Sequence, residues 1–443
     1  MKKLLTILMM FALTLGANAK VAVKRDFSSV INESGIEKNS ISISIRDLSS
    51  GKAVYELNEK MLMHPASVQK ILTLVPAVKT LGEDYEFTTA IYKRNADSFV
   101  IKLGADPYLT SNDLKTLVNN VNLETKRIYI DDSILEKKDW GEGWQWDDDM
   151  NVLMPRFNSY NLDRNLIKVT IMPTSNGQAA TIINPSKYPI VFFNHVTTGH
   201  ENSVRISRDN SVSANTLVLE GTVNKPTTIY VPTNNLKRYF NIKLTNALGD
   251  KKVYLKENFI IDKITDSDKE LDKVTHPISG AIDDVLKNSN NMISETLAKL
   301  AGAKAYKDIG TDINGIKVFN AYCQKIDIDN SKIRLTDASG VSKNNLVTTD
   351  FISEYLVKNK DSKVLEHLPT PGQGTLTHRM LPIKENLRAK TGTLSDTSSI
   401  AGFLTTKNGN KYAFAIIIND TTSTIPDMKT LEDYLIREAY LRL

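Results

Sequence analysis

The sequence predicts a multidomain α/β protein in which one α/β domain is assembled from the two ends of the chain. Three observations indicate this fold class: strand patterns near both ends, long helical patterns between them, and many short alternating runs from about residue 87 to 262. The short runs predict β-rich domains inserted into the main domain. A chain of 443 residues is long enough for two or three domains of about 100 to 200 residues each.

The first nineteen residues have the pattern of a secretory signal peptide. Lys2 and Lys3 precede the apolar run "LLTILMMFALTLG", and the small residues Ala17 and Ala19 follow it, so we expect cleavage after Ala19. The run is shorter than the ~20 residues that a membrane-spanning helix needs. We therefore expect a periplasmic or secreted protein, and a single cysteine, Cys323, favours a bacterial periplasm or cell surface.

Two strands are expected to lead into a buried helix at the start of the main domain. "SISISIRDL" (40–48) and "AVYELN" (53–58) alternate as strands do, with the turn-like "SSGK" between them. From about Ala66 the apolar residues of "ASVQKILTLVPAVKTL" predict a buried helix.

The middle of the chain changes to short strand patterns separated by Asn, Gly and Pro turns. These runs are "FVIKL", "KRIYI", "LIKVTIM", "TLVLEGTV" and "TTIYVP". Their density predicts a β-rich region that is separate from the main domain.

The last third returns to long helices, such as "GAIDDVLKNSNNMISETLAKLAGAKAY", and then to two strands, "SSIAGFLTT" and "KYAFAIIIN". The "KNGN" between the strands contains Asn-Gly, which is typical of a tight hairpin turn. A final helix is expected to pack on the sheet through one face. That face holds Met428, Leu431, Leu435 and Ala439.

The net charge of +5 is small and the chain has no long basic run, so nothing indicates nucleic-acid binding. Peripheral membrane association is not indicated, and the sequence leaves oligomerisation open. The consecutive acids Asp147 to Asp149 point in different directions along a chain, and we interpret them as a polar structural corner instead of a metal site. We expect no metal and no organic cofactor.

Ser67 and Lys70 lie three residues apart where the first helix begins. A serine in the first turn lies near unpaired backbone N–H groups and the positive end of the helix dipole, and Lys70 shares its face. A lysine becomes a general base when burial and a second cation lower its pKa. The alternative is chance, since serine starts helices well and lysine is common in this chain.

Two further motifs could supply the second cation and other polar groups of a catalytic site. Ser289 and Asn291 form S-x-N at the start of a helix, although both residue types are also favoured at helix N-caps. Lys390, Thr391 and Gly392 precede the terminal strand pair, where a lysine is often only a solvated edge residue. Gly392 would let a peptide backbone approach closely, and an open sheet edge could accept an extended substrate as an added strand.

In the order S-x-x-K, S-x-N, K-T-G, the three motifs resemble the signature of the penicillin-recognising serine peptidases. Four further segments, "ADPYLTSNDL", "WGEGWQWDDDMNVLMPRFNSYNLDRN", "LTDASGVSKNN" and "PGQGTLTHRM", are similar to the D-alanyl-D-alanine carboxypeptidase/endopeptidase group typified by penicillin-binding protein 4, peptidase family S13. The middle residue Asn290 and Ala338 depart from the usual acidic residue and glycine. Neither departure removes a reactive group.

The resemblance implies a transpeptidase/β-lactamase-like α/β/α sandwich built from both chain ends, with an inserted domain and a third domain nested within it. The expected ranges are 1–19 for the signal peptide, 20–86 and 263–443 for the catalytic domain, 87–165 and 226–262 for the inserted domain, and 166–225 for the nested β-rich domain.

The resemblance also implies roles for individual residues. Ser67 would attack the D-alanyl carbonyl, Lys70 would be the base, and Ser289 with Lys390 would relay the proton to the leaving amine. Asn291 would orient Lys70 and hold the amide of the substrate.

The remaining roles concern the charge that develops on the substrate. The backbone N–H groups of Ser67 and Thr393 would form the oxyanion hole, and Lys390 with the hydroxyls of Thr391 and Thr393 would bind the terminal carboxylate. Gly392 belongs to the same expected binding strand.

The expected substrates are peptidoglycan stem peptides and crosslinks, and β-lactam antibiotics would acylate Ser67 as inhibitors. Two alternatives stay open at this point. A β-lactamase shares the three motifs but needs a water-activating base, and the "EGTVN" that comes near one such motif continues a strand pattern. A non-catalytic scaffold that binds peptidoglycan would keep the fold without the reaction.

Overall fold

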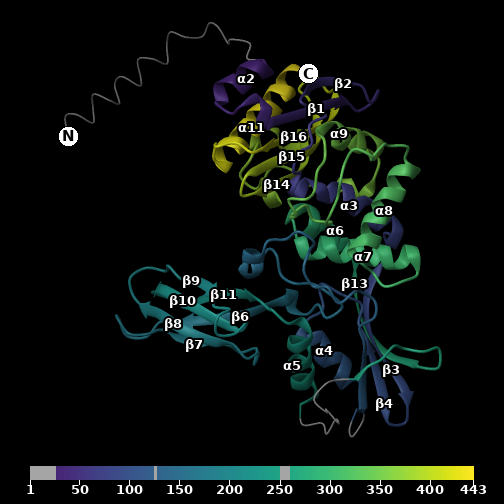
Figure 1. The fold of residues 1–443 in the computed structure, drawn as a ribbon, viewed down its shortest axis with the longest axis vertical. Helices are drawn as coiled ribbons and strands as arrows, with labels where there is room; N and C mark the ends of the chain where they lie inside the picture. The colour runs from purple at the N-terminus through teal and green to yellow at the C-terminus, as the bar shows by residue number, and fades with distance from the viewer. Residues whose placement is uncertain (1–25, 124–126, 250–259) are drawn as a thin grey trace.

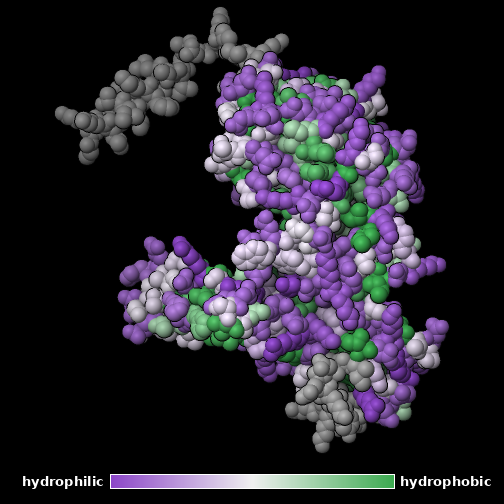
Figure 2. All heavy atoms as spheres, in the orientation of Figure 1, coloured by the Kyte–Doolittle hydropathy of each residue, from purple (hydrophilic) through white to green (hydrophobic). Residues whose placement is uncertain are grey.

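The chain forms an elongated molecule with the main sheet at one end, a second sheet toward the other end, and an arm of two smaller sheets at the side (Figure 1). The structure is a computed structural model that describes residues 26–123, 127–249 and 260–443. The expected signal peptide and its cleavage site after Ala19 lie outside the described residues. Polar residues cover most of the face shown in Figure 2, and apolar residues occur there in scattered groups.

The main sheet joins the two ends of the chain. Its five strands lie in the order β14-β15-β16-β1-β2, with antiparallel pairing throughout. The bounds are β1 Ile41–Asp47, β2 Ala53–Leu57, β14 Leu387–Leu394, β15 Thr397–Thr405 and β16 Lys411–Asn419. The register of β1 on β16 runs from Ile41 opposite Ile418 to Asp47 opposite Tyr412. The prediction of an α/β domain built from both chain ends is confirmed.

Helices cover both faces of this sheet. On one face, α2 (Phe27–Ser34) and α11 (Ile425–Arg442) share a core with side chains of β1 and β16. Figure 1 shows these first and last elements side by side at one end of the molecule. The four apolar residues predicted to form the inner face of α11 are all at most 2 % exposed. The helical face of the C-terminal segment is therefore confirmed.

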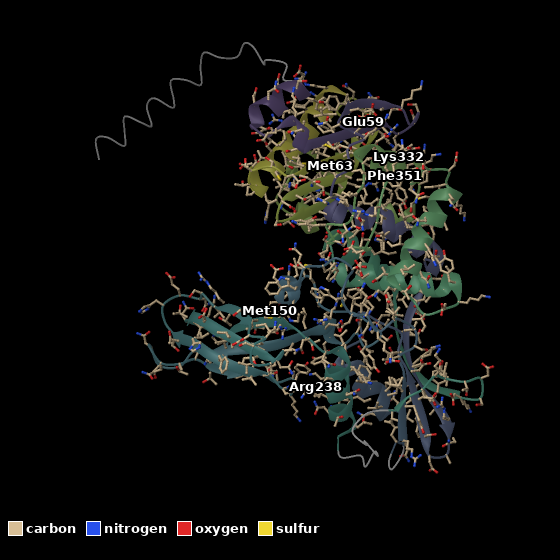
Figure 3. The ribbon with its side chains drawn as sticks, in the orientation of Figure 1. Glu59, Met63, Met150, Arg238, Lys332 and Phe351 are labelled. Atoms are coloured by element: carbon tan, nitrogen blue, oxygen red, sulfur yellow. The ribbon has the colours of Figure 1, made fainter. Side chains whose placement is uncertain are left out.

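The other face carries a second layer of helices. Its helices are α3 Gln69–Leu81, α6 Ile278–Lys287, α7 Asn291–Tyr306, α8 Asp312–Lys325, α9 Thr349–Lys358 and α10 Lys363–Glu366. Helix α3 lies in the middle of this layer, against α7 and α8, and eleven of its thirteen residues are buried. Met63 and Phe351 belong to the same core (Figure 3).

A second five-stranded sheet lies beyond the helical layer, in the order β12-β5-β4-β3-β13. Its strands are β3 Glu86–Asn95, β4 Ser98–Lys102, β5 Arg127–Asp131, β12 Ile260–Ile261 and β13 Lys269–Pro277. Helices α4 (Ser111–Asn119) and α5 (Leu236–Leu248) pack on it. Strand β13 pairs with β3 although it falls within the range expected for the catalytic domain.

Two three-stranded sheets form an arm at the side of the molecule (Figure 1). One sheet contains β6 Leu166–Met172, β7 Thr181–Ile183 and β11 Thr227–Pro232, and the other β8 Val191–Thr198, β9 Arg205–Arg208 and β10 Thr216–Val223. Because β11 pairs with β6, the arm continues past residue 225, where the nested domain was expected to end. The segment "EGTVN" lies at the end of β10, as its alternating pattern predicted.

Short 3₁₀ segments lie between the helices and strands. They are η1 Lys38–Ser40, η2 Ala66–Val68, η3 Trp146–Met150, η4 Asp163–Asn165, η5 Gly374–Leu376 and η6 Leu381–Asn386. Met150 of η3 packs against the core of the inserted region (Figure 3). Within the described ranges, no helix has the length and apolar character that crossing a membrane requires.

Candidate active site

Ser67 lies in a tight turn immediately before the buried helix of the catalytic domain. The expected helix start at Ala66 is the 3₁₀ turn η2, and the regular helix α3 begins at Gln69. Ala66 has φ +47°, a left-handed conformation that a residue with a Cβ rarely adopts. The neighbours Ala66 and Val68 are buried, whereas Ser67 stays partly exposed. The turn therefore presents the serine hydroxyl at the surface of a rigid core.

Lys70 contacts Ser67 directly. Its Nζ lies 2.8 Å from Ser67 Oγ, 2.6 Å from Asn291 Oδ1 and 2.7 Å from the carbonyl oxygen of Ser339. The side chain is fully buried, and burial lowers the pKa of Lys70 to about 7 although the charges of Asp337 and Glu295 oppose this change. Lys70 therefore holds a neutral amine beside the hydroxyl within the physiological pH range.

Ser289 and Lys390 form a second serine–lysine pair. Lys390 Nζ donates a hydrogen bond to Ser289 Oγ at 2.9 Å and another to the carbonyl of Thr391 at 2.7 Å. Lys390 is fully buried, and its pKa lies well below the usual range because of burial and, second, the charge of Lys70. Ser289 has φ +59° in the connection between α6 and α7. Lys390 therefore lies within electrostatic reach of Lys70, whereas the low pKa of Lys70 itself comes from burial.

Asn291 is the first residue of α7, and Asn290 is the N-cap. The side-chain oxygen of Asn291 accepts a hydrogen bond from Lys70 at 2.6 Å. Its nitrogen donates to the carbonyl of Leu153 at 2.9 Å. Asn291 therefore links the lysine to the inserted segment, and its amide nitrogen already has a partner before any substrate is considered.

The K-T-G residues lie in β14, a strand at the edge of the main sheet that the sequence patterns did not assign. The Thr391 hydroxyl donates to the Thr375 hydroxyl at 2.6 Å. A Cβ at Gly392 would lie 2.8 Å from the backbone nitrogen of Ser67, so the strand passes directly against the turn that carries Ser67. Thr393 follows with an exposed side chain, opposite Ser398 in the register.

The structure brings in residues that the sequence did not single out. Glu295 is 2 % exposed and accepts hydrogen bonds from the backbone N–H groups of Ala338 (3.0 Å) and Ser339 (2.8 Å). Burial, with the nearby charge of Asp337, raises the pKa of Glu295 to about 8. Ala338 needs no glycine because its φ lies outside the left-handed region, and its methyl group is buried.

Asp337 organises the turn that carries Ser339. Its carboxylate accepts hydrogen bonds from the backbone N–H groups of Gly340 and Ser342, each at 2.8 Å, and from Trp144 Nε1 at 2.9 Å. Trp144 comes from the inserted segment, so this carboxylate connects the insertion to the turn. In the sequence, the only indication of this contact was that the segments around Trp144 and Asp337 both resemble the family pattern.

His64 and Asp149 each have a partner outside the Ser67–Lys70 contacts. His64 Nδ1 lies 3.2 Å from the carbonyl oxygen of Asn345, which gives the ring a backbone partner. Asp149 pairs with Arg208 of β9 at 2.7 Å, consistent with a structural corner. Across the three described ranges, no group of three or more His, Cys, Asp or Glu residues is placed to hold a metal ion.

A partly exposed serine beside a buried lysine, with a second serine–lysine pair at the edge strand of an α/β/α sandwich, defines a serine hydrolase of the Ser–Lys class. The model of the D-Ala-D-Ala carboxypeptidase 3 (S13) family matches residues 23–437. The chain belongs to this family. The resemblance seen in the motifs is thereby confirmed, as is the enzyme class, a serine D-Ala-D-Ala carboxypeptidase.

Individual relatives agree with the family assignment. The chain is 25% identical over 433 residues to the D-alanyl-D-alanine carboxypeptidase DacB of Haemophilus influenzae, covering 90% of each chain. It is 23% identical over 444 residues to a D-alanyl-D-alanine carboxypeptidase of an Actinomadura species, covering 91% of this chain and 82% of that one.

A solved structure shares the fold. It is that of penicillin-binding protein 4 from Haemophilus influenzae, with a TM-score of 0.81 and 23% identity, over 94% of this chain and 100% of that one. The predicted α/β multidomain fold is therefore confirmed at the level of the whole chain.

Proposed function

We propose that this chain hydrolyses the terminal D-Ala–D-Ala bond of peptidoglycan stem peptides through an acyl-enzyme on Ser67. The observation that carries the proposal is the 2.8 Å contact between Ser67 Oγ and the Nζ of Lys70, a fully buried lysine whose pKa burial lowers to about 7. A neutral amine at this position accepts the hydroxyl proton as the oxygen attacks.

The first half of the reaction exchanges one bond for another. Ser67 Oγ forms a bond to the carbonyl carbon of the penultimate D-alanine, its proton goes to Lys70, and the bond to the terminal D-alanine nitrogen breaks. Ser289, held by Lys390, gives its hydroxyl proton to the leaving amine and takes the proton that Lys70 had accepted, so Lys70 is neutral again. Water then attacks the ester and gives a proton to Lys70, which passes it to Ser67 Oγ as the ester bond breaks and the shortened peptide leaves.

The K-T-G strand is the binding element in this proposal. The backbone N–H groups of Ser67 and Thr393 stabilise the oxyanion, a contribution of about 3 to 4 kcal/mol for a single donor in other serine hydrolases. The hydroxyls of Thr391 and Thr393, with Lys390, take the terminal carboxylate. The position of β14 at the sheet edge supports binding of the peptide as an added strand.

The same scheme extends to crosslinks and to inhibitors. Hydrolysis of the D-alanyl bond of a crosslink needs the same acyl-enzyme with a bulkier leaving amine, so we propose endopeptidase activity as well. β-Lactam antibiotics present a reactive amide and a carboxylate to the same groups and would acylate Ser67. This substrate requires a location in the periplasm or outside the cell, in keeping with the signal peptide expected from the sequence.

Two measurements on the purified protein test the proposal. Intact mass after exposure to a fluorescent penicillin should show one adduct, which is absent from Ser67→Ala and present in Ser49→Ala, a serine at an exposed turn. Release of D-alanine from a pentapeptide should follow the same pattern. A folded wild type with neither adduct nor D-alanine release would overturn the proposal in favour of a scaffold, and sustained hydrolysis of penicillin would indicate a β-lactamase.

A further inference from the structure

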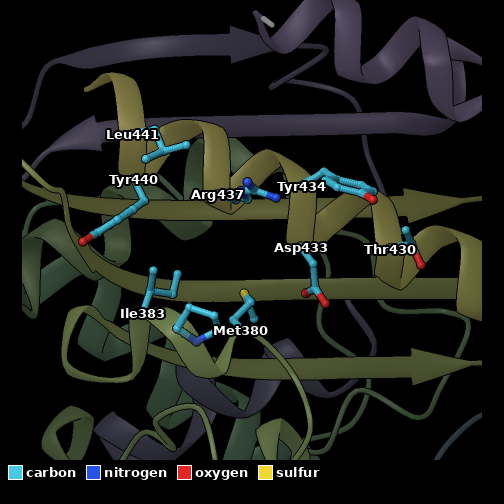
Figure 4. Close-up of a pocket in the computed structure, with 9 residues that line it drawn as sticks. Met380, Ile383, Thr430, Asp433, Tyr434, Arg437, Tyr440 and Leu441 are labelled. Atoms are coloured by element: carbon cyan, nitrogen blue, oxygen red, sulfur yellow. The ribbon is translucent and has the colours of Figure 1, made fainter. Parts of the chain in front are cut away.

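A cavity of roughly 630 Å³ lies beside helix α11, on the face of the main sheet opposite to α3. It opens between the outer side of α11 and the segment that begins η6 (Figure 4). Its volume falls within the range of about 300 to 1,000 Å³ that small-molecule sites occupy. Among the residues that line it, none belongs to the Ser67, Lys70, Ser289 and Lys390 constellation.

The walls of the cavity are mostly apolar and aromatic. Met380 and Ile383 form the wall opposite α11, and Tyr434, Tyr440 and Leu441 come from the helix itself. Figure 4 shows Tyr440 reaching from the helix toward Ile383. Rings and a thioether around one space favour a flat aromatic group, because offset ring contacts and sulfur–ring contacts each stabilise such a ligand.

The charges in the cavity wall are unequally paired. Asp433 accepts hydrogen bonds from Arg379 at 3.0 and 2.6 Å, and the same arginine pairs with buried Glu432 at 2.8 Å. Arg379 thus satisfies both carboxylates. Arg437 lies one turn after Asp433 and is exposed to the cavity, and no described residue pairs with it or accepts a hydrogen bond from it.

We propose that this cavity binds a small aromatic carboxylate. The carboxylate lies on the Arg437 guanidinium, whose planar N–H groups match two carboxylate oxygens. The ring lies between the two tyrosines of α11 and the Met380–Ile383 wall. An uncharged ligand of the same shape would leave the guanidinium without its partner, so the site selects for the anion.

The experiment is isothermal titration calorimetry of the full-length mature protein with naphthalene-2-carboxylate as the probe. The expected result is saturable binding at one site, with naphthalene-2-carboxamide at least tenfold weaker. Arg437→Gln should weaken the carboxylate at least tenfold. Arg442→Gln is the matched control, because it removes the same charge from the last turn of the same helix, where Arg442 pairs with Glu438 outside the cavity.

A second variant tests the location without removing the arginine. Leu441 is 44% exposed, so Leu441→Glu is compatible with folding and places a negative charge in the wall. It should also weaken the carboxylate at least tenfold and leave the carboxamide unchanged. Wild-type affinity in either Arg437→Gln or Leu441→Glu, equal affinity for acid and amide, or no saturable binding to the wild type would each overturn the proposal.

Discussion

The carboxylate of Glu295 accepts a hydrogen bond from the backbone N–H of Ser339 at 2.8 Å, and the carbonyl of Ser339 accepts one from Lys70 at 2.7 Å. Glu295 lies one turn after Asn291 on α7, and Asn291 accepts the other buried hydrogen bond from Lys70. One helix therefore positions the lysine from two sides, directly through Asn291 and through a backbone turn by way of Glu295.

Glu295→Gln should lower kcat with little change in KM, because Glu295 touches the turn that holds Lys70 and, in the proposed scheme, no substrate. The new amide places an N–H₂ group against the N–H of Ala338, and displacement of the Ser339 carbonyl misplaces the base. A loss of roughly 10- to 100-fold is expected, the size that small misplacements cause. The measurement is steady-state kinetics on a pentapeptide from pH 5.5 to 9.

Two readouts distinguish a positioning role from general destabilisation. Burial raises the pKa of Glu295 to about 8, so its carboxyl group is largely neutral near pH 7, and Glu295→Gln should leave the acid limb of kcat/KM in place while it lowers kcat. Glu432→Gln is the matched control, since Glu432 is another fully buried glutamate, on α11. It should lower the melting temperature and leave the kcat of the folded protein unchanged. A wild-type kcat in Glu295→Gln would contradict the positioning role.

The wild-type pH dependence follows from Lys70 itself. The pKa of Lys70 is lowered to about 7, and in the proposed scheme this lysine acts as the base in its neutral form. Below that pH the neutral fraction falls by a factor of ten per unit, so kcat/KM should rise with pH up to about 7 and then level off. A profile that is flat from pH 5 to 8, or that falls over that interval, would exclude neutral Lys70 as the base.

The same lowered pKa predicts a pH-dependent stability. Between about pH 7 and pH 10.5, Lys70 binds a proton in the unfolded state and not in the folded state. The free energy of unfolding therefore rises with pH over this interval. Burial of Lys70 is most destabilising at and below pH 7. Lys70→Met removes this dependence, which amounts to at most ~1.4 kcal/mol per pH unit. The melting temperature of the variant minus that of the wild type should therefore fall from pH 7 to 9.5.

The control for this measurement is Lys79→Met, which removes a lysine from the exposed face of the same helix α3. Lys70→Met also leaves three hydrogen-bond acceptors without their donor, which changes the melting temperature at every pH. The test is therefore how the difference in melting temperature between variant and wild type changes with pH. A difference between Lys70→Met and wild type that stays constant over the interval would show that the buried lysine keeps its proton.

Local sequence patterns were sufficient to predict the helices and strands that bury one face in the core. The alternation in β1 and β16 and the spacing of Met428, Leu431 and Leu435 in α11 predicted strands and a helix that the structure contains. The S-x-x-K pair could also be predicted, because residues three apart share a helix face.

The parts that could not be predicted depend on contacts between distant residues. Glu295 and Ser339 are 44 positions apart, and Ser289 and Lys390 are 101 apart, so no local pattern joins them. Strand β14 carries Lys390 and Gly392, and its pairing with β15 overrides their weak strand preference. Strand β13 has mostly exposed residues, so its sequence lacks the alternation that marks a strand with one buried face.

Asp284 connects the inserted region to Ser289. Its carboxylate accepts hydrogen bonds from Tyr108 at 2.8 Å, from Arg164 at 2.9 Å and from Asn288, the residue before Ser289, at 2.7 Å. Asp284→Ala should lower kcat/KM about tenfold by releasing the left-handed turn at Ser289, a loss in the range of positioning effects. The measurement is D-alanine release from a pentapeptide.

The neighbouring residue provides the control for Asp284→Ala. Asp283 pairs with Lys287 and His367, and none of its ion pairs reaches the inserted region. Asp283→Ala should leave kcat/KM unchanged. Equal activities of the two variants would contradict the link from the insertion to Ser289.

Gly392 should tolerate no side chain, because β14 passes too close to the turn that carries Ser67. A Cβ at this position would lie 2.3 Å from Ser399 Oγ, 2.8 Å from the backbone nitrogen of Ser67 and 2.9 Å from the Cβ of Ala66. Displacement of the Ser399 hydroxyl breaks its hydrogen bond to the carbonyl of Pro65, and the Ser67 backbone can move only with the buried turn. Gly392→Ala should therefore separate β14 from the turn and misalign the two proposed oxyanion donors.

The expected loss in kcat for Gly392→Ala is about 10²- to 10³-fold, the cost of one oxyanion donor elsewhere. Gly280→Ala is the control, because its Cβ would meet only Tyr108, at an ordinary 3.7 Å, in helix α6. It should keep full activity. Adding Ser399→Ala should not restore Gly392→Ala, since the contact with the Ser67 nitrogen persists. Two results would show that β14 and the turn that carries Ser67 move independently. One is recovery of activity when Ser399→Ala is added to Gly392→Ala, and the other is activity of Gly392→Ala within threefold of the wild type.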